Sequence, residues 1–280
     1  MILYKYASMS GVRILDDLSL KVTPPNELND PFELTPCSLE FMTRQYLLDR
    51  AEHDPEHFRP AYNEWVKQEQ RTESFSTFLQ ALRQMSRKTY SNFLHLYRAA
   101  LIEADLTAVH EASQHMVVLC LSSVNDSIPM WSHYANHHKG IAIGLDTRDR
   151  CLRFGSPLCK VEYRNRRVSL NRQGTSGPKA RLQRVIQMIR TKSRDWKYEQ
   201  EYRFSYAKRD TRRQIAQDGQ TIYLIPIWPS AIKEVILGCC MPQQDEQKVR
   251  HFLELRRFAH VRPLRARRHA KQFRLDIVPA

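Results

Sequence analysis

The sequence predicts an α+β fold in which a mainly antiparallel sheet carries an all-helical insertion over residues 34–114. Two patterns predict it. Short apolar or alternating runs, typical of strands, occur before residue 34 and after residue 115. Residues 34–114 contain no glycine and place apolar residues at three- and four-residue steps, as amphipathic helices do. We therefore expect a core domain formed by residues 1–33 and 115–280, with a helical domain inserted into it.

The first strand and the loop after it contain the first candidate residues. Residues 1–6 alternate, so Tyr4 and Tyr6 share one face of a strand and Lys5 takes the other. In the later loop, the sequence Asn29-Asp30-Pro favours a turn, because a residue before proline avoids helical angles. Asn29 and Asp30 either cap backbone groups there or bond a ribose or an amide.

Residues 115–146 predict a strand, a polar loop, a short aromatic helix and a second strand. Residues 116–121 form an apolar run, and the turn formers that begin at Ser122 interrupt it. The helix begins near Pro129 and ends at Lys139-Gly140. The polar and aromatic side chains expected at this strand end are Ser122, Ser123, Asn125, Trp131, His133 and Tyr134.

Two interpretations of this helix remain open. Trp131 and Tyr134 either pack in the core or line a site. A helix that only packs would more often use leucine, isoleucine and alanine. His133 and His137 are one turn apart and could bind a metal, but no cysteine or acidic ligand lies nearby at a fixed spacing. We expect no metal.

Residues 196–206 alternate like a single strand. Trp196, Tyr198 and Tyr202 share one face of it, and Glu199, Glu201 and Arg203 share the other. The aromatic face is the expected core side, so the carboxylates are predicted to face a cleft or solvent. A structural ladder of ion pairs is the alternative, with Arg203 pairing one carboxylate.

The chain carries a net charge of +14, from 44 basic and 30 acidic residues. This excess predicts attraction to a polyanion, with nucleic acid as the first candidate. The most concentrated basic stretch is residues 262–274, which holds no acidic residue. Its predicted nucleic-acid-binding residues are Arg262, Arg265, Arg267, Arg268, Lys271 and Arg274. A merely solvated basic surface is the alternative.

The remaining composition predicts a cytoplasmic protein. None of the six cysteines forms a CxxC pair, and most lie among apolar residues, as reduced and buried thiols do. No charged-then-apolar leader opens the chain, and no apolar run is long enough to span a membrane.

Five motifs together resemble the bacterial family catalogued as domain of unknown function 2971. In chain order they are LYKY at 3–6, NDPFE at 29–33, MWSHYANHHKG at 130–140, WKYEQEYR at 196–203 and IKEVILG at 232–238. They cover nearly the whole chain apart from the predicted helical insertion.

A wider similarity is to ADP-ribosyltransferases, which grip NAD in the cleft of a split, mostly antiparallel sheet. That resemblance implies Tyr4, Lys5 and Tyr6 on the first strand, then Ser122 with Trp131, His133 and Tyr134 at the middle motif. Asn29, Asp30 and Arg203 would also serve NAD binding. Glu199-Gln200-Glu201 resembles the E-x-E pattern, whose second glutamate is catalytic. The chain departs from the pattern in having no arginine on the first strand and no full Ser-Thr-Ser motif.

The resemblance implies an NAD-dependent ADP-ribosyltransferase that modifies nucleic acid or protein, as a toxin or phage-defence effector would. NAD would be its substrate. Two alternatives from other classes remain open. One is a non-enzymatic module that binds nucleic acid through its charge. The other is a metal-dependent nuclease that uses Glu199, Glu201 and His133.

Overall fold

The computed structural model describes residues 1–33, 44–69, 72–168, 178–215 and 219–280. The chain divides into two compact units, the first formed by residues 1–28, 115–163 and 193–280 and the second by residues 29–114 and 164–192. The predicted division differs in two ways. The second unit begins at Asn29, and it includes residues 164–192, which the sequence analysis placed in the core domain.

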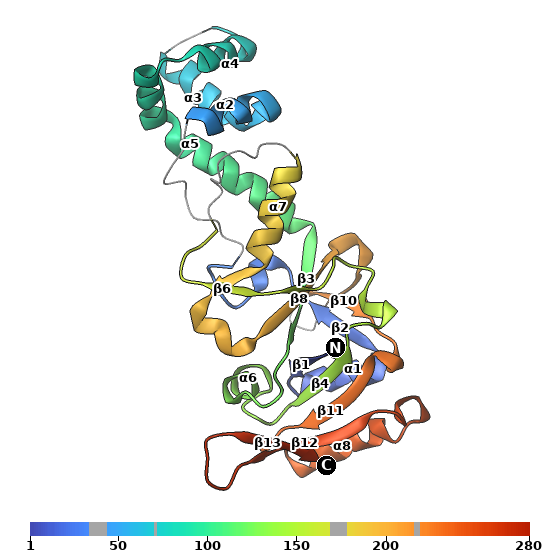
Figure 1. The fold of residues 1–280 in the computed structure, drawn as a ribbon. Coiled ribbons are helices and arrows are strands. Elements are labelled where there is room, and N and C mark those ends of the chain that lie inside the picture. The colour runs from blue at the N-terminus through green and yellow to red at the C-terminus, as the bar shows by residue number, and fades with distance from the viewer. Residues whose placement is uncertain (34–43, 70–71, 169–177, 216–218) are drawn as a thin grey trace. The chain divides into compact units, whose positions relative to one another are not determined.

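An eight-stranded sheet forms the centre of the first unit (Figure 1). Its strands are, in spatial order, β13 (Leu275–Pro279), β12 (Arg262–Arg268), β11 (Ile232–Leu237), β4 (Ile141–Asp146), β1 (Ile2–Ala7), β3 (Met116–Ser122), β8 (Glu201–Ala207) and β5 (Cys159–Lys160). Every neighbouring pair is antiparallel except β11 and β12, which are parallel. The predicted mainly antiparallel sheet is therefore confirmed.

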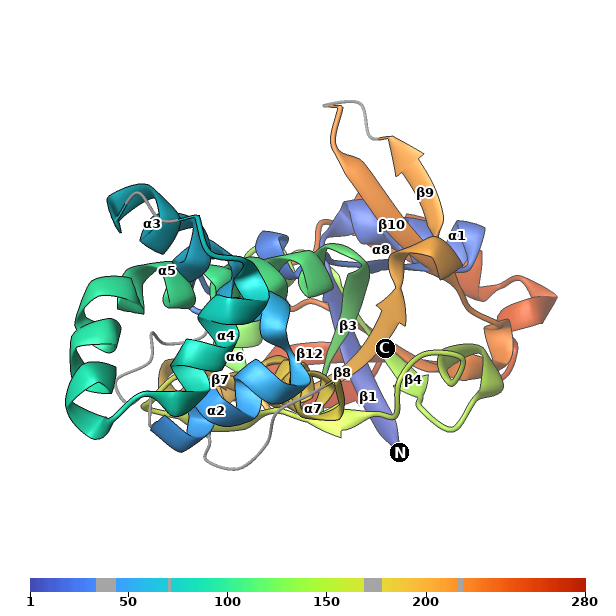
Figure 2. The ribbon, with the colours of Figure 1, turned by 90° about the horizontal axis from the view of Figure 1, so that it is seen from above.

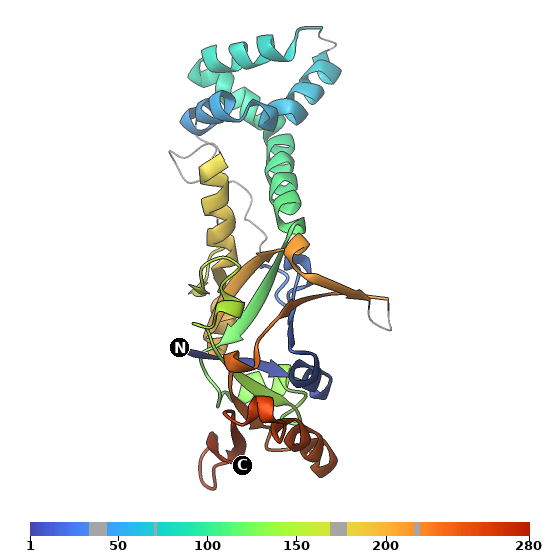
Figure 3. The ribbon, with the colours of Figure 1, turned by 90° about the vertical axis from the view of Figure 1, so that its right-hand side faces the viewer.

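Smaller elements complete the first unit. A second sheet contains β2 (Ser19–Val22), β10 (Thr221–Pro226) and β9 (Arg212–Ile215). Figure 2 shows β9 and β10 as a pair that extends away from the large sheet. The helices of this unit are α1 (Arg13–Asp17), α6 (Ile128–Tyr134) and α8 (Gln243–Leu253). Figure 3 shows α8 at the same end of the unit as the C-terminal strands. Apart from the elements of this unit, the chain forms a two-stranded sheet of β6 (Glu162–Arg164) and β7 (Thr191–Ser193).

The large sheet packs differently on its two faces because strand side chains alternate. Leu3, Leu119 and Ile143 point into an extensive apolar cluster that also contains α1 and β2 residues. Tyr6 and Ala142 point to the other face, where a smaller cluster includes Trp131 of α6. The second face therefore carries the smaller apolar cluster, and Tyr4 on this face is half-buried.

The sheet is nearly divided between β1 and β3. Only one residue pair, Tyr4 with Ser122, is registered between these two strands, whereas β1 and β4 share six. Further back along β3, Val118 pairs with Thr23 instead, through two backbone hydrogen bonds of 2.8 and 2.9 Å. The polar ends of β1 and β3 therefore meet at a single row of residues.

The second unit is mainly helical where the structure describes it, as predicted for residues 34–114. Its helices are α2 (Arg44–His53), α3 (Arg59–Glu69), α4 (Phe75–Gln84), α5 (Arg87–Gln114) and α7 (Pro178–Ile189). Phe58, Phe78 and Phe93 contribute to one apolar core. Ser74 caps α4, because its hydroxyl accepts the N–H of Thr77 at 3.2 Å. A buried ion pair links Lys192 Nζ to Glu33 Oε1 at 2.8 Å.

No helix among the described residues is long and apolar enough to cross a membrane. Short 3₁₀ turns link many of the elements. Their bounds are η1 (Met9–Val12), η2 (Pro25–Glu27), η3 (Pro55–Phe58), η4 (Arg150–Leu152), η5 (Arg194–Glu199), η6 (Lys208–Asp210), η7 (Pro229–Ala231) and η8 (Arg256–Phe258).

The close packing of Gly140, which follows α6, against Ala7 at the end of β1 can be tested by substitution. A Cβ atom added at Gly140 would lie 2.1 Å from the carbonyl oxygen of Ala7. We expect Gly140→Ala to lower the free energy of unfolding by about 1–3 kcal/mol, because backbone must move to accept the methyl group. Urea denaturation followed by circular dichroism measures this.

Gly219→Ala is the matched control. Gly219 has a φ of +81° but open space around the position of its missing Cβ. Its substitution should cost only the backbone strain, about 1 kcal/mol. Equal losses for the two variants would mean that the approach of Ala7 does not limit position 140.

Candidate active site

A single row of residues crosses the face of the large sheet that carries the smaller apolar cluster. Tyr4 of β1 pairs with Ser122 of β3, and Ser122 pairs with Glu201 of β8. On its other side Tyr4 pairs with Gly144, which pairs with Glu234 of β11. Side chains of directly paired residues point to the same face. The first-strand, middle and late motifs of the sequence therefore converge on one line.

The segment before β8 is not the continuous strand that its alternation predicts. Residues 194–199 form η5, and Gln200 adopts a left-handed conformation with φ 45° and ψ 50° before the strand starts at Glu201. Gln200 Nε2 donates to the carbonyl oxygen of Lys197 at 2.9 Å, which closes this turn. Trp196 and Tyr198 therefore do not share a strand face with Tyr202, and this part of the prediction is wrong.

Glu201 is buried, and the prediction that it faces a cleft or solvent is wrong. Glu201 is 4% exposed and Arg203 is 0% exposed. The Arg203 guanidinium donates to both carboxylate oxygens at 2.8 Å, through Nε and an Nη. The Glu201 N–H also donates to the hydroxyl of Tyr163 at 2.8 Å. A two-pronged bond of this kind fixes both the charge and the orientation of the carboxylate.

Glu199 is buried as well, and it connects three elements. The hydroxyl of Tyr134, at the end of α6, donates to Glu199 Oε1 at 2.6 Å. The hydroxyl of Ser122 donates to the backbone carbonyl of Glu199, also at 2.6 Å. Ser122 is 1% exposed. Its hydroxyl thus positions η5 against β3, and its assignment as a cofactor-binding residue stays a prediction.

Trp131 and Tyr6 lie in the core, as the packing interpretation of Trp131 predicts, and their assignment as cofactor-binding residues stays a prediction. Trp131 is fully buried, and its indole N–H donates to the carbonyl of Asn125 at 2.7 Å. Its ring meets that of Tyr6 edge to face, with centroids 5.3 Å apart. The Tyr6 hydroxyl donates to the carbonyl of Val124 at 2.9 Å. Together the two rings hold the polar loop between β3 and α6.

Partly exposed aromatic residues surround the buried glutamates. Tyr4, Tyr134 and Tyr198 are half-buried, and His133 is exposed. The His133 ring lies 6.3 Å from the Tyr134 ring and 6.2 Å from the Tyr198 ring, between centroids. Tyr4, His133 and Tyr134 belong to the predicted set, whereas Tyr198 does not. The described part of the chain brings together no group of three or more His, Cys, Asp or Glu side chains suited to a metal.

Lys5 lies at the division between β1 and β3. Its ammonium group donates to the carbonyl of Cys120 at 3.3 Å. Burial lowers the pKa of Lys5, although the nearby carboxylate of Glu201 opposes this shift. Lys5 points to the opposite face of β1 from Tyr4, and its assignment as a cofactor-binding residue stays a prediction.

Asn29 and Asp30 belong to the second unit. Asn29 is exposed and Asp30 is buried. Asp30 Oδ1 accepts the N–H of Phe32 at 2.9 Å, as the turn-capping interpretation predicts.

The sequence analysis did not select Glu234, which lies at the other end of the row. Glu234 is 4% exposed. Its carboxylate accepts from the Tyr4 hydroxyl at 3.3 Å and from the Arg262 guanidinium at 2.5 Å. Burial and the charge of Glu234 both raise the pKa of Tyr4. Gly144 makes this approach possible, since a Cβ there would lie 2.7 Å from Glu234 Cγ. The sequence does contain a signal for Glu234, because an acidic residue inside the apolar run of residues 232–237 is unusual.

The predicted basic patch is not one surface, because alternation along β12 divides it. Arg262 points to the face of Tyr4, where it pairs with Glu234. Arg265 points to the opposite face and pairs with Glu246 of α8. Arg268 points to the same face as Arg262, and Arg267 points to the same face as Arg265. Lys271 and Arg274 lie after the end of β12. Only part of the six-residue set can therefore meet one ligand.

The comparison with protein families bears on this same region. Residues 130–204 match the family described as protein of unknown function (DUF2971). The resemblance to this family is confirmed over that segment. The DUF2971 match begins in α6 and ends in β8, so it spans Tyr134, Glu199, Glu201 and Arg203. No curated protein and no solved structure matches the chain.

The buried pair predicts an asymmetric response to substitution. We expect Arg203→Met to lower the free energy of unfolding by about 3–5 kcal/mol, because it leaves the Glu201 charge buried without its partner. The double variant Glu201→Leu/Arg203→Met should recover most of this loss, since neither charge remains. Chemical denaturation of the single and double variants measures the difference.

Arg148→Met is the control for removing an arginine. The side chain of Arg148 is 80% exposed in its pair with Asp146, so its removal should leave the free energy of unfolding nearly unchanged. A double variant less stable than Arg203→Met would show that the pair itself, rather than the unpaired charge, dominates the stability.

His138 predicts a loss of stability in acid. Burial and the neighbouring His137 lower its pKa from the ordinary value of 6.5. Between the lowered pKa and 6.5, the unfolded chain therefore binds more protons than the folded chain, and stability falls as the pH falls through this range. His138→Asn should flatten this slope, since asparagine tolerates the φ of 65° found here. Thermal unfolding between pH 7.5 and 5 tests this, and an unchanged slope would contradict it.

Proposed function

We propose that the chain is an NAD-dependent ADP-ribosyltransferase whose site is the row of Tyr4, Ser122 and Glu201. The convergence of these residues in register carries the proposal. They come from the three motifs that the resemblance requires, in the same chain order. The near division of the sheet between β1 and β3 agrees with the split sheet of those enzymes.

The proposed chemistry needs an ionised carboxylate. When the bond between nicotinamide and ribose breaks, nicotinamide leaves with the bonding electrons and positive charge builds on the ribose. A fixed carboxylate stabilises that charge until the acceptor attacks the same ribose carbon. The bidentate bond from Arg203 favours the ionised form of Glu201 and fixes its direction.

Burial and hydrogen bonding favour some side chains over others as the groups that hold NAD in this proposal. The Ser122 hydroxyl is used by the Glu199 carbonyl, and Trp131 is enclosed in the core. The half-buried Tyr4, Tyr134 and Tyr198 and the exposed His133 are therefore the proposed stacking and hydroxyl groups. Because Glu199 and Glu201 are at most 4% exposed, NAD must displace part of this aromatic cover to reach them. Glu199 acts in support by binding the Tyr134 hydroxyl.

Two assays on the purified chain test the proposal. The protein is incubated with NAD labelled in its adenine, together with cell protein or nucleic acid. Release of free nicotinamide reports cleavage, and label on a macromolecule reports transfer. Glu201→Gln should lower nicotinamide release by about a hundred-fold or more per folded molecule. Glu254→Gln, an exposed carboxylate after α8, is the control and should keep full activity.

The folded fraction is measured alongside by circular dichroism, because Glu201→Gln weakens a buried ion pair. If Glu201→Gln keeps its activity per folded molecule, the pair is a structural ladder and the proposal fails. Tyr134→Phe should lower activity less than Glu201→Gln, since it removes only a hydroxyl that orients Glu199.

The two alternatives give different outcomes in the same assays. A non-enzymatic module would retain nucleic acid and leave NAD intact. A metal-dependent nuclease would cut nucleic acid only with a divalent ion. The geometry favours the nuclease less, because the described residues bring together no group of three or more His, Cys, Asp or Glu side chains that could hold a metal ion.

A further inference from the structure

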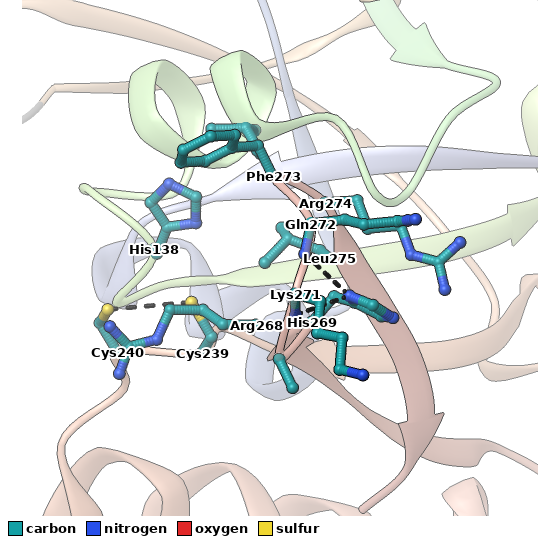
Figure 4. A pocket seen from close by; sticks show the side chains of 12 residues that line it. His138, Cys239, Cys240, Arg268, His269, Lys271, Gln272, Phe273, Arg274 and Leu275 are labelled. Carbon is teal, nitrogen blue, oxygen red and sulfur yellow. Dashed lines mark hydrogen bonds between the residues drawn. The ribbon is translucent and has the colours of Figure 1, made fainter.

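A hollow of about 520 Å³ lies beside the turn between β12 and β13 in the first unit (Figure 4). Three stretches line it. Ile128 and His138 come from either end of the α6 region, and Cys239 and Cys240 follow β11. The rest of the lining is residues 268–275, the end of β12 and the turn to β13. None of these residues belongs to the row of Tyr4, Ser122 and Glu201.

The lining is cationic. Arg268, Lys271 and Arg274 contribute to it, and no acidic residue does. Arg274 lies 3.3 Å from Asp276, but both side chains are well exposed, so this pair neutralises little. All three cations are exposed to solvent. They are therefore available to a phosphate without breaking a buried interaction.

Phe273 is the second feature of the hollow. It is 103% exposed, so its ring makes almost no contact with the rest of the chain. A lone exposed phenylalanine at the tip of a cationic turn gains nothing for folding. Aromatic rings beside cationic grooves stack on the bases of single-stranded nucleic acids, because every base has an aromatic face.

The turn that carries Phe273 is held in shape. His269 Nδ1 accepts the N–H groups of Lys271 at 3.1 Å and of Gln272 at 3.0 Å. The backbone N–H of His269 in turn donates to the carbonyl of Arg274 at 3.1 Å. A turn fixed in this way loses little entropy when a ligand binds.

We propose that this hollow binds a single-stranded nucleic acid, with Phe273 stacking on a base and Arg268 and Lys271 contacting the phosphates. Ile128, Cys239 and Leu275 in the lining offer apolar and sulfur atoms to a sugar or a neighbouring base. A duplex fits less well, because its bases are stacked on each other and cannot reach the ring. The binding stands apart from the proposed transfer reaction and requires no NAD.

Fluorescence anisotropy of the purified protein with a labelled twelve-nucleotide single strand tests the proposal. Phe273→Ala should weaken binding roughly ten-fold, within the range for the removal of one stacked base. Arg268→Ala/Lys271→Ala should weaken it further. The double variant should also reduce the dependence of log K on log salt by about 0.7 for each phosphate that the protein no longer neutralises.

Arg267→Ala is the matched control, because Arg267 is exposed on the same strand but points to the opposite face of the sheet. It should leave the affinity nearly unchanged. If Arg267→Ala weakens binding as much as Arg268→Ala, the attraction is spread over the basic surface and the hollow is not the site. Equally tight binding to a duplex of the same length, or to vesicles of anionic lipid in place of the strand, would also overturn the proposal.

Alkylation of Cys240 gives an independent readout. Its thiol is exposed in the lining of the hollow, and it lies 3.8 Å from that of Cys239. Burial raises the pKa of the thiols of Cys239, Cys120 and Cys151, so these should react more slowly. Bound single strand should slow the alkylation of Cys240 several-fold in the wild type and, at the same strand concentration, clearly less in Phe273→Ala. Labelling of Cys240 at the same rate with and without the strand would contradict the proposal.

Discussion

The buried ion pair between Glu201 and Arg203 constrains the centre of this structure. Two charges removed from water must satisfy each other, because an unpaired buried charge costs several kcal/mol. Arg203 meets this requirement by donating to both oxygens of Glu201 from two residues further along β8. The start of β8 is thereby fixed, and the neighbouring elements are arranged around it. Tyr163 bonds the Glu201 N–H, and Ser122 bonds the carbonyl of Glu199.

The two faces of the large sheet differ, because one face carries most of the apolar core and the other carries the polar row proposed as the site. One face carries the larger apolar cluster, which includes residues of β2, α1 and α8. The other face is covered by α6 and a smaller cluster, in which Trp131 and Tyr6 use their polar atoms to hold the loop after β3. The polar row crosses this second face, where Tyr4 and Tyr134 are half-buried. Both candidate regions, the row and the hollow, depend on this uneven distribution of apolar residues.

The charge of the chain also has more than one role. Arg262 and Arg265 neutralise buried or half-buried glutamates on opposite faces of β12, and Lys192 neutralises Glu33 in the second unit. These cations contribute to the net charge of +14 yet are already paired in the fold. Arg268 and Lys271 remain exposed around a hollow that has no acidic residue. The number of basic residues in the sequence is therefore larger than the number of exposed positive charges available to bind a polyanion.

The sequence by itself determined the features that depend on local pattern. Alternation and apolar runs predicted strands β1, β3 and β4, and helical periodicity predicted the helical character of the second unit. The DUF2971 resemblance followed from consecutive residues such as MWSHY. The tertiary structure decided where the strands end and which side chains are buried or paired, because the alternation of residues does not contain this information. One left-handed residue, Gln200, ended the apparent strand before Glu201, and a partner on the same strand allowed that carboxylate to be buried. The pairing of Tyr4 with Glu234 across Gly144 joins residues 230 positions apart, and the division of the basic patch followed from which face of β12 meets α8. The local sequence pattern determines which side chains share a face of a strand. Which of these side chains are buried, and which residues they contact, depends on which strands become neighbours in the sheet.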